Sequence, residues 1–326
     1  MIYLEMAGRL GNQMFRYSFA RKLSLLSGKE LIIDFDRVYK KDNYLNTNGW
    51  TNSLKLFKAK NNFKELNNSK GKIFFRNASF MQLYYYFYFK FFSKILKKNK
   101  KKLKEFQLKM QPKLNKYNLF FLELGFYNYD LSHLNSTKVV YVCGCFESSE
   151  YFNSIKNVVL EDFQSLKQLS KKNKELMSVI INSNSVCVTV RRGDFVTNKK
   201  NSKLYNICNK KYFDNAISKM ISLVKNPVFI VFSDDVEWTK NNLDFKKCPV
   251  YYEDGDDTLE EKLRMMSSCK HFIISNSTFS WWAQYLSKNQ QKIVISPNRW
   301  YKNAMESDLI EKEWLTINTE DGDNIE

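Results

Sequence analysis

The second half of the chain alternates short apolar runs with segments of helical periodicity, and this alternation restricts the possible folds more than any other feature. The apolar runs are rich in β-branched and aromatic residues, as strands buried on both faces are. Strands that alternate with helices form parallel sheets, because each connection crosses one face of the sheet. The sequence therefore predicts a Rossmann-like α/β domain. Its expected strands are Ser185–Val190, Val228–Phe232, Pro249–Tyr252, His271–Ser275 and Lys292–Ile295.

The beginning of the chain predicts a smaller version of the same arrangement. Two expected strands, Ile2–Leu4 and Leu31–Phe35, enclose an apolar stripe of helical spacing that stops at Gly28. The segment Gly8–Gln13, GRLGNQ, is expected as a loop after the first strand. It does not match the GxGxxG dinucleotide fingerprint. Its glycines allow either close backbone approach to a ligand or a plain tight turn.

We expect two domains, residues 1–175 and 176–326, with a basic and aromatic insertion at about residues 40–135 in the first. The 326 residues carry 52 basic and 34 acidic side chains, a net charge of +18 that suits an anionic partner. Two histidines leave little scope for a His-rich metal site or a catalytic triad. Six cysteines without zinc spacing and no signal-like start predict a reduced, cytoplasmic protein.

The insertion contains an aromatic run that passes into a lysine run. Nine of the thirteen residues in Phe80–Phe92 are aromatic, and Lys90–Lys116 contains eleven lysines against one acid, Glu105. One interpretation is a buried aromatic helix followed by a solvated basic helix. A second is peripheral contact of Phe80–Lys116 with an anionic membrane, at its inner face. A third, binding of single-stranded nucleic acid, is disfavoured because the aromatic and basic residues are segregated rather than interleaved.

Three expected strands of the second domain end in polar clusters. These are Arg191–Asp194, Ser233–Asp235 and Ser275–Thr278. Carboxyl ends of parallel strands meet at one edge of a sheet, where ligands bind. Arginines would neutralise a diphosphate, a carboxylate would accept N–H bonds from a guanine or bind ribose, and a helix N-terminus would hold phosphate. The alternatives are a structural Arg–Asp ion pair and ordinary helix capping.

Six motifs resemble the α-1,2-fucosyltransferases of glycosyltransferase family 11 along the whole chain. They are GRLGNQMFRYSFARKL (Gly8–Leu23), GCFESSEYF (Gly144–Phe152), VTVRRGDF (Val188–Phe195), FSDDVEW (Phe232–Trp238), SNSTFSWWAQYL (Ser275–Leu286) and SPNRW (Ser296–Trp300). The resemblance implies a GT-B-like fold of two Rossmann-like domains with parallel sheets facing across a cleft. It further implies inverting, metal-independent transfer of L-fucose from GDP-fucose to the 2-hydroxyl of a terminal β-galactose, without a cofactor.

The resemblance assigns roles to residues of the motifs. The catalytic group is Arg191, Arg192 and Asp194, and Glu147 is an acceptor contact. Asp194 and Glu147 are also the candidates for the general base. Thr189 stands where the family commonly has a histidine, so a charged role there is not shared. The donor-binding residues are Gly11, Asn12, Gln13, Asp234, Asp235, Asn276, Ser277, Thr278 and Phe279.

Two other functions compete with this interpretation. A metal-dependent glycosyltransferase would use an Asp-x-Asp pair, and Asp34-Phe35-Asp36 or Asp254-Gly255-Asp256 has that spacing. A basic protein without catalysis would bind nucleic acid or membrane through its net positive charge. Selective thermal stabilisation by GDP would favour the enzyme, whereas steeply salt-dependent nucleic-acid affinity would favour the binding protein.

Overall fold

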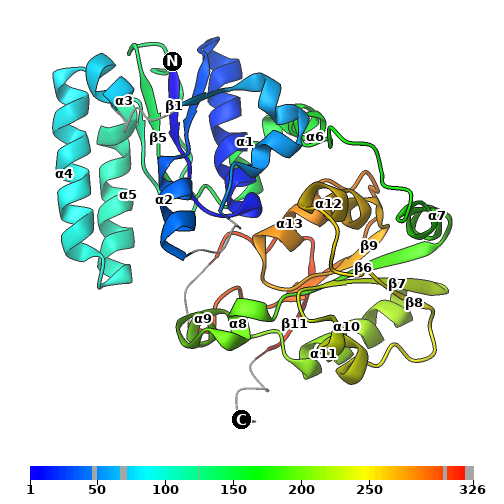
Figure 1. Cartoon of the computed structure of the whole chain (residues 1–326). Coiled ribbons are helices and arrows are strands. Elements are labelled where there is room, and N and C mark those ends of the chain that lie inside the picture. Colours follow the sequence, from blue (N-terminus) through cyan, green and yellow to red (C-terminus); the bar gives the residue numbers. More distant parts are fainter. Residues whose placement is uncertain (46–49, 67–71, 124, 304–306, 320–326) are drawn as a thin grey trace. The chain divides into compact units, whose positions relative to one another are not determined.

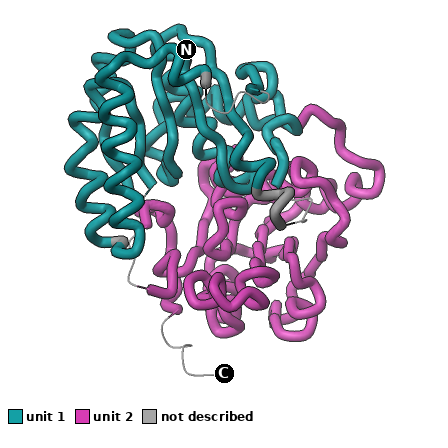
Figure 2. The backbone as a smooth tube through the Cα atoms, turned by 60° about the vertical axis from the view of Figure 1, so that its left-hand side comes forward, with its two compact units in different colours: residues 1–164 teal, residues 165–326 magenta. Residues whose placement is uncertain are grey.

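The computed structural model describes residues 1–45, 50–66, 72–123, 125–303 and 307–319. The chain divides into two compact units, Met1–Gln164 and Ser165–Glu326 (Figure 2). The division falls before the expected boundary at 175/176, because residues 165–175 bond to the second unit. The Ser170 N–H donates to the Glu261 carboxylate, 2.7 Å away, and the Asn173 amide donates to Asp257 and Glu261.

The first unit is built on a parallel sheet of strand order β3-β2-β1-β5-β4 (Figure 1). Its strands are β1 (Ile2–Glu5), β2 (Leu31–Asp34), β3 (Lys64–Leu66), β4 (Leu119–Phe120) and β5 (Val140–Val142). Its helices are α1 (Leu10–Ser27), α2 (Asp36–Leu45), α3 (Lys72–Asn77), α4 (Phe80–Leu96), α5 (Lys100–Lys116) and α6 (Lys156–Asp162). Four 3-10 turns lie at Ser53–Leu56, Lys58–Asn62, Ser149–Tyr151 and Asn153–Ile155.

The second unit has a parallel sheet of order β11-β10-β9-β6-β7-β8, the arrangement of a Rossmann fold. Its strands are β6 (Asn184–Val190), β7 (Pro227–Ser233), β8 (Val250–Tyr252), β9 (His271–Ile273), β10 (Val294–Pro297) and β11 (Leu315–Ile317). Its helices are α7 (Lys174–Asn182), α8 (Gly193–Thr197), α9 (Lys199–Tyr205), α10 (Lys210–Leu223), α11 (Val236–Asn242), α12 (Leu259–Ser268) and α13 (Thr278–Tyr285).

Burial explains why β6 lies in the middle of this sheet. Val186 and Val188 are fully buried, and they pack with the stripe of α10 formed by Phe213, Ile217 and Met220. A strand with apolar side chains on both faces must have a neighbour on each side and a layer on each face. The prediction of two α/β units with parallel sheets is thus confirmed.

Three edge strands were missed by the sequence analysis, and each is three residues long or shorter. β11 is largely exposed, and Lys64 and Glu65 occupy most of β3. β4 is apolar but contains two residues only. Such strands form by pairing with a neighbour in the folded sheet. Their own sequences are too short to show the alternation of apolar and polar residues that predicts a strand.

The aromatic and basic runs form two helices, α4 and α5, that pack side by side (Figure 1). Phe89 of α4 stacks on Phe106 of α5, with ring centroids 5.7 Å apart, and on Phe121 at 5.0 Å. The interpretation of a buried aromatic helix followed by a solvated basic helix is correct only in part, because α4 buries one face and leaves the other exposed. Among the described residues, no helix is both long and apolar enough to cross a bilayer.

We predict that Gly144→Ala destabilises the first unit. A Cβ at this position, just after β5, would lie 2.3 Å from the Leu122 carbonyl oxygen and 2.9 Å from the Leu122 nitrogen. The Leu122 backbone cannot move aside as a flexible side chain can. We therefore expect the variant to lose about 1–3 kcal/mol in unfolding free energy, measured by denaturant titration. Gly193→Ala is the matched control, because its Cβ meets only the carboxylate end of Asp234. Equal stability of the two variants would contradict the prediction.

Candidate active site

The register between β6 and β7 determines which charges meet beyond the ends of these strands. The two strands pair in register to their last residues, Val190 and Ser233. The next residues along each strand continue this pairing as ion pairs. Nη1 of Arg191 lies 2.6 Å from Oδ2 of Asp234, and Nε of Arg192 lies 3.1 Å from Oδ2 of Asp235.

Arg191 is the more exposed of the two arginines. Its guanidinium forms a second ion pair with Asp194 and stands over the Phe195 ring, 5.5 Å from the centroid. The side chain keeps 29% of its surface accessible. A guanidinium has five N–H donors, so these two ion pairs leave it able to bind an incoming anion.

Arg192 is held more firmly. Its guanidinium lies 3.9 Å from the centre of the Trp238 ring, a cation–π contact, and its side chain is 18% exposed. Asp235 pairs with it and also caps α11 by accepting the Trp238 N–H at 3.2 Å. The capping interpretation of the aspartate pair therefore applies to Asp235. Trp238 lies in the FSDDVEW motif, but its contact with Arg192 was not predicted from the sequence.

Gly193 permits the close approach of Asp234 to the end of β6. A Cβ on Gly193 would lie 2.6 Å from Oδ2 of Asp234. The other carboxylate oxygen, Oδ1, accepts the Arg192 backbone N–H at 2.8 Å. Asp234 is thus held by one guanidinium and one backbone donor, in a place that a larger residue at 193 would occupy.

The third strand end lies next to β6 on its other side. Oγ1 of Thr189 accepts the backbone N–H of Ser275 at 3.1 Å and so connects β6 to the segment after β9. Ser277 precedes α13, and its side chain makes no capping bond to the helix. Thr278 and Phe279, both half-buried, form the first turn of α13. This helix start presents backbone N–H groups suited to phosphate.

Asn276 has a structural place in this segment. Its amide donates to the carbonyl oxygens of Tyr205 and Trp300, both at 2.9 Å, and its oxygen accepts from the Cys208 thiol. The residue is 2% exposed. Its side chain thus bonds within the second unit, and a contact with the donor substrate stays a prediction.

The three polar strand ends follow β7, β6 and β9, which are adjacent in the sheet. The chain leaves β6 toward β7 and β8, and later continues on the other side from β9, so the β6–β9 boundary is the topological switch point at which α/β sheets bind ligands. The cluster contains the two arginines against the carboxylates of Asp194, Asp234 and Asp235. An anion bound here would therefore depend on N–H donors as well as on net charge.

The expected Gly8–Gln13 loop is in part helical, because α1 begins at Leu10. Gly11, Asn12 and Gln13 therefore lie in its first turn. Gln13 is fully buried: its amide donates to the carbonyl oxygens of Gly8 and Thr51, and its oxygen accepts the Ser53 N–H at 3.1 Å. Its side chain bonds to three backbone groups of the first unit, and its role in binding the donor substrate stays a prediction.

Asn12 and Glu147 come from the segments that follow β1 and β5, which are neighbours in the first sheet. The Asn12 amide donates to Oε1 of Glu147 at 3.4 Å. Burial raises the pKa of the Glu147 carboxyl, and the nearby Arg16 guanidinium opposes this rise only in part. A carboxyl group with a raised pKa is suited to accept a proton near neutral pH.

The two Asp-x-Asp pairs have structural partners. Asp34 is buried and accepts the Asp36 backbone N–H at 2.8 Å. Glu253, Asp254 and Asp257 bring carboxylate oxygens within 4.8 Å of one another, the spacing of a metal site among the described residues. The Lys172 ammonium lies 3.1 Å from Asp254 and 3.0 Å from Asp257, so a lysine already supplies positive charge there. That the reaction needs no metal ion stays a prediction.

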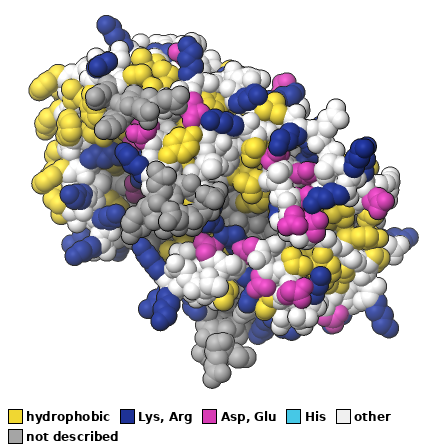
Figure 3. All heavy atoms as spheres, viewed as in Figure 1, with side chains coloured by type: hydrophobic (Ala, Val, Ile, Leu, Met, Phe, Trp, Pro, Cys, Tyr) yellow, Lys and Arg dark blue, Asp and Glu magenta, His cyan; other side chains and the backbone are white. Residues whose placement is uncertain are grey.

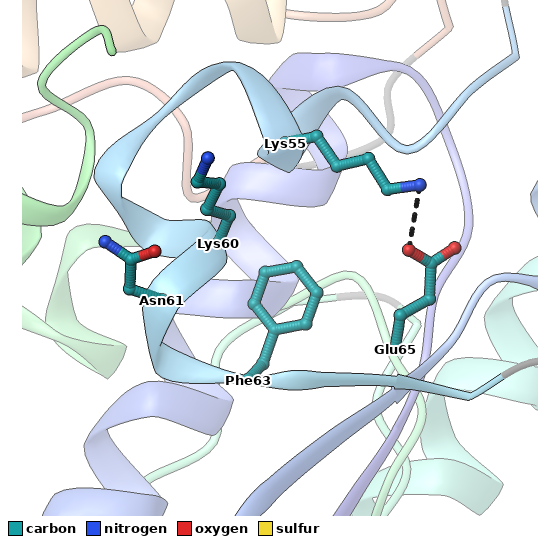
Figure 4. Close-up of a pocket in the computed structure, with 5 residues that line it drawn as sticks. All are labelled: Lys55, Lys60, Asn61, Phe63 and Glu65. Carbon is teal, nitrogen blue, oxygen red and sulfur yellow. Dashed lines mark ion pairs between the residues drawn. The ribbon is translucent and has the colours of Figure 1, made fainter.

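A surface hollow of 390 Å³ lies elsewhere in the first unit (Figure 4). Lys55 and Glu65 form an ion pair of 3.0 Å at its side. The hollow contains none of the predicted site residues. It is lined by Lys55, Lys60, Asn61, Phe63 and Glu65.

We predict that Glu147→Gln stabilises the protein at neutral pH but not at pH 4. A folded-state pKa above the ordinary 4.5 means that ionising Glu147 opposes folding. This destabilisation is absent below pH 4.5 and complete once the pH exceeds the raised pKa. Glutamine retains the acceptor for Asn12 and removes the charge. Melting temperatures of parent and variant at both pH values test this, and a variant less stable than the parent at neutral pH would contradict it.

Comparison with known proteins agrees with these motifs. The O-antigen biosynthesis glycosyltransferase WbnK of Escherichia coli is 29% identical over 97% of this chain and 100% of its own. An alpha-1,2-colitosyltransferase of Escherichia coli is 35% identical over 49% of this chain and 55% of its own. Galactoside alpha-(1,2)-fucosyltransferase 1 of Leontopithecus chrysomelas is 33% identical over 31% of this chain and 28% of its own.

Among solved structures, fucosyltransferase NodZ from Bradyrhizobium aligns with a TM-score of 0.46 at 10% identity, covering 87% of this chain and 91% of that one. The family model described as Glycosyl transferase family 11 matches residues 1–318. The chain is therefore a glycosyltransferase that belongs to glycosyl transferase family 11.

Proposed function

We propose that the protein transfers L-fucose from GDP-fucose to the 2-hydroxyl of a terminal β-galactose, with inversion and without a metal ion. The observation that carries this proposal is the cluster at the β6–β9 switch point, where Arg191 and the start of α13 follow adjacent strands. Two relatives support it, because the names of both specify an α-1,2 linkage and one specifies a galactoside acceptor.

In this proposal the diphosphate is held by N–H donors from two elements. The start of α13, with Ser277 before it and Thr278 in its first turn, offers backbone N–H groups, and Arg191 offers its remaining guanidinium donors. As the sugar leaves, negative charge grows on the diphosphate. Donors already in position stabilise that charge without reorganisation. Asp234 holds Arg191 in place in the free enzyme and is the candidate for the guanine or ribose contact.

Two residues are candidates for the base that removes the proton of the acceptor hydroxyl. The Asp194 carboxylate already pairs with Arg191 and accepts from the Asn201 amide at 3.1 Å, so its oxygens are engaged within the second unit. Burial instead raises the pKa of Glu147. We therefore assign the base to Glu147, with Asn12 orienting its carboxyl.

A second sugar donor should be compared with GDP-fucose, because one relative is named as a colitosyltransferase and matches 162 residues at 35% identity. A colitosyl donor that carries the same nucleoside diphosphate would use the same site and would differ only in the sugar. The nucleotide site thus does not discriminate between them, and turnover with each donor does.

The test is incubation of the full chain with GDP-fucose or the corresponding colitosyl donor and a set of β-galactosides. We expect a product whose new linkage, determined by NMR, is α to the galactose 2-hydroxyl, and undiminished turnover in excess EDTA. A linkage to another hydroxyl would overturn the acceptor assignment. Activity abolished by EDTA and restored by a divalent ion would establish the metal-dependent alternative.

We predict that Arg191→Ala lowers turnover by about 10²–10³ while the protein remains folded, because one donor to the departing diphosphate is lost. Steady-state kinetics and circular dichroism measure the two effects. Arg76→Ala, which removes an exposed arginine of α3, is the control with the same change in charge. A folded Arg191→Ala protein that retains most of its activity would refute the assignment.

We also predict that Gly193→Ala raises KM for the donor several-fold with little loss of stability. The new Cβ displaces the Asp234 carboxylate, the partner of Arg191, whereas the backbone around it stays in place. Gly144→Ala provides the contrast, a loss of stability without a direct effect on the donor site. A Gly193→Ala enzyme with the parent KM would show that the position of Asp234 does not matter for donor binding.

A further inference from the structure

One face of α4 presents a row of large apolar side chains to solvent. Residues 80, 84, 87, 91 and 95 follow the three- and four-residue spacing that puts side chains on one side of a helix. We call this row the α4 outer face; its exposed fractions are 80% for Phe80, 51% for Tyr84, 59% for Phe87, 62% for Phe91 and 58% for Ile95. Figure 3 shows apolar side chains gathered at the edge of the molecule where α4 lies in Figure 1.

Contacts on the opposite side prevent α4 from turning this row inward. The buried Gln82 amide donates to the carbonyl oxygens of Tyr117 and Val139, both at 2.9 Å. The Lys90 ammonium donates to the Cys143 sulfur at 3.5 Å, also on the inner side. Rotation of the helix would break these bonds inside the unit. The exposure of the row is therefore built into the fold.

Exposed lysines adjoin this face in the sequence and carry no acidic partner among the described residues. A single acid, Glu105, lies between residues 94 and 116. Lysines that are not neutralised attract the surface of an anionic bilayer. The exposed lysines of α4, α5 and their connection are Lys94, Lys97, Lys98, Lys101, Lys102, Lys109, Lys113 and Lys116.

We propose that the α4 outer face docks onto the surface of an anionic lipid bilayer, with α4 lying in the plane of the headgroups. Aromatic rings suit the region between headgroups and acyl chains, and lysines beside them contact the lipid phosphates. A second copy of the chain fits less well. Pairing two such faces would bring two lysine-rich helix pairs together, and like charges at an interface are unfavourable.

The test is co-sedimentation of the full chain with vesicles of phosphatidylcholine alone or mixed with phosphatidylglycerol. We expect binding to the anionic vesicles to be about ten-fold tighter or more, and to weaken as salt is added. Phe87→Ser with Phe91→Ser should lower that binding by about ten-fold or more. Leu26→Ser with Ile181→Ser is the matched control, because these side chains are 57% and 59% exposed and lie outside the row.

Charge-reversal variants distinguish electrostatic attraction to anionic lipid from non-specific hydrophobic adsorption. Lys97→Glu with Lys98→Glu should weaken binding to anionic vesicles, whereas Lys171→Glu with Lys174→Glu, exposed lysines of the other unit, should leave it unchanged. Equal binding to both vesicle types, or unchanged binding by the Phe87/Phe91 variant, would overturn the proposal. So would a dimer in sedimentation velocity that this variant dissociates, with no vesicle binding. These outcomes are independent of the proposed transfer reaction, which a soluble acceptor tests.

Discussion

The parallel register of β6 against β7 is the constraint from which the candidate site follows. Because Val190 faces Ser233, the next two residues of each strand face one another as Arg191 with Asp234 and Arg192 with Asp235. A shift of one residue would exchange these partners and turn each side chain to the other face of the sheet. The ladder of backbone hydrogen bonds in the core thus positions charges at the sheet edge.

The charges so placed do not form a simple cationic pocket. Each arginine is paired with an aspartate before any substrate arrives, and Arg192 is also stacked on Trp238. Such pairing orients a guanidinium without occupying all of its N–H donors. An anion bound there would rely on placed N–H groups, from Arg191 and from the start of α13, more than on excess positive charge. The net charge of +18 arises elsewhere in the chain, notably in the lysines of α4 and α5.

Much of the site was predictable because it lies in sequence motifs at the ends of well-marked strands. Arg191, Asp234 and Ser277 each follow an apolar run, and parallel strands bring such positions to one edge. Two of the predicted donor-binding residues also hold the fold together. Gln13 and Asn276 are buried amides that bond backbone carbonyls. A polar residue in a motif looks the same whether it holds a ligand or the loop around it, and only its surroundings distinguish the two.

The sequence by itself determined the two α/β units, the central strands and the family, because these depend on local apolar patterns and on motifs that are contiguous in the chain. The tertiary structure decided which carboxylate meets which arginine, which helix start lies beside them and which face of α4 remains exposed. Those facts depend on strand order, register and helix rotation, which arise from contacts between residues far apart in the sequence. The aromatic run shows the difference, since its composition indicates burial, yet Gln82 and Lys90 fix the rotation that leaves Phe87 and Phe91 in solvent.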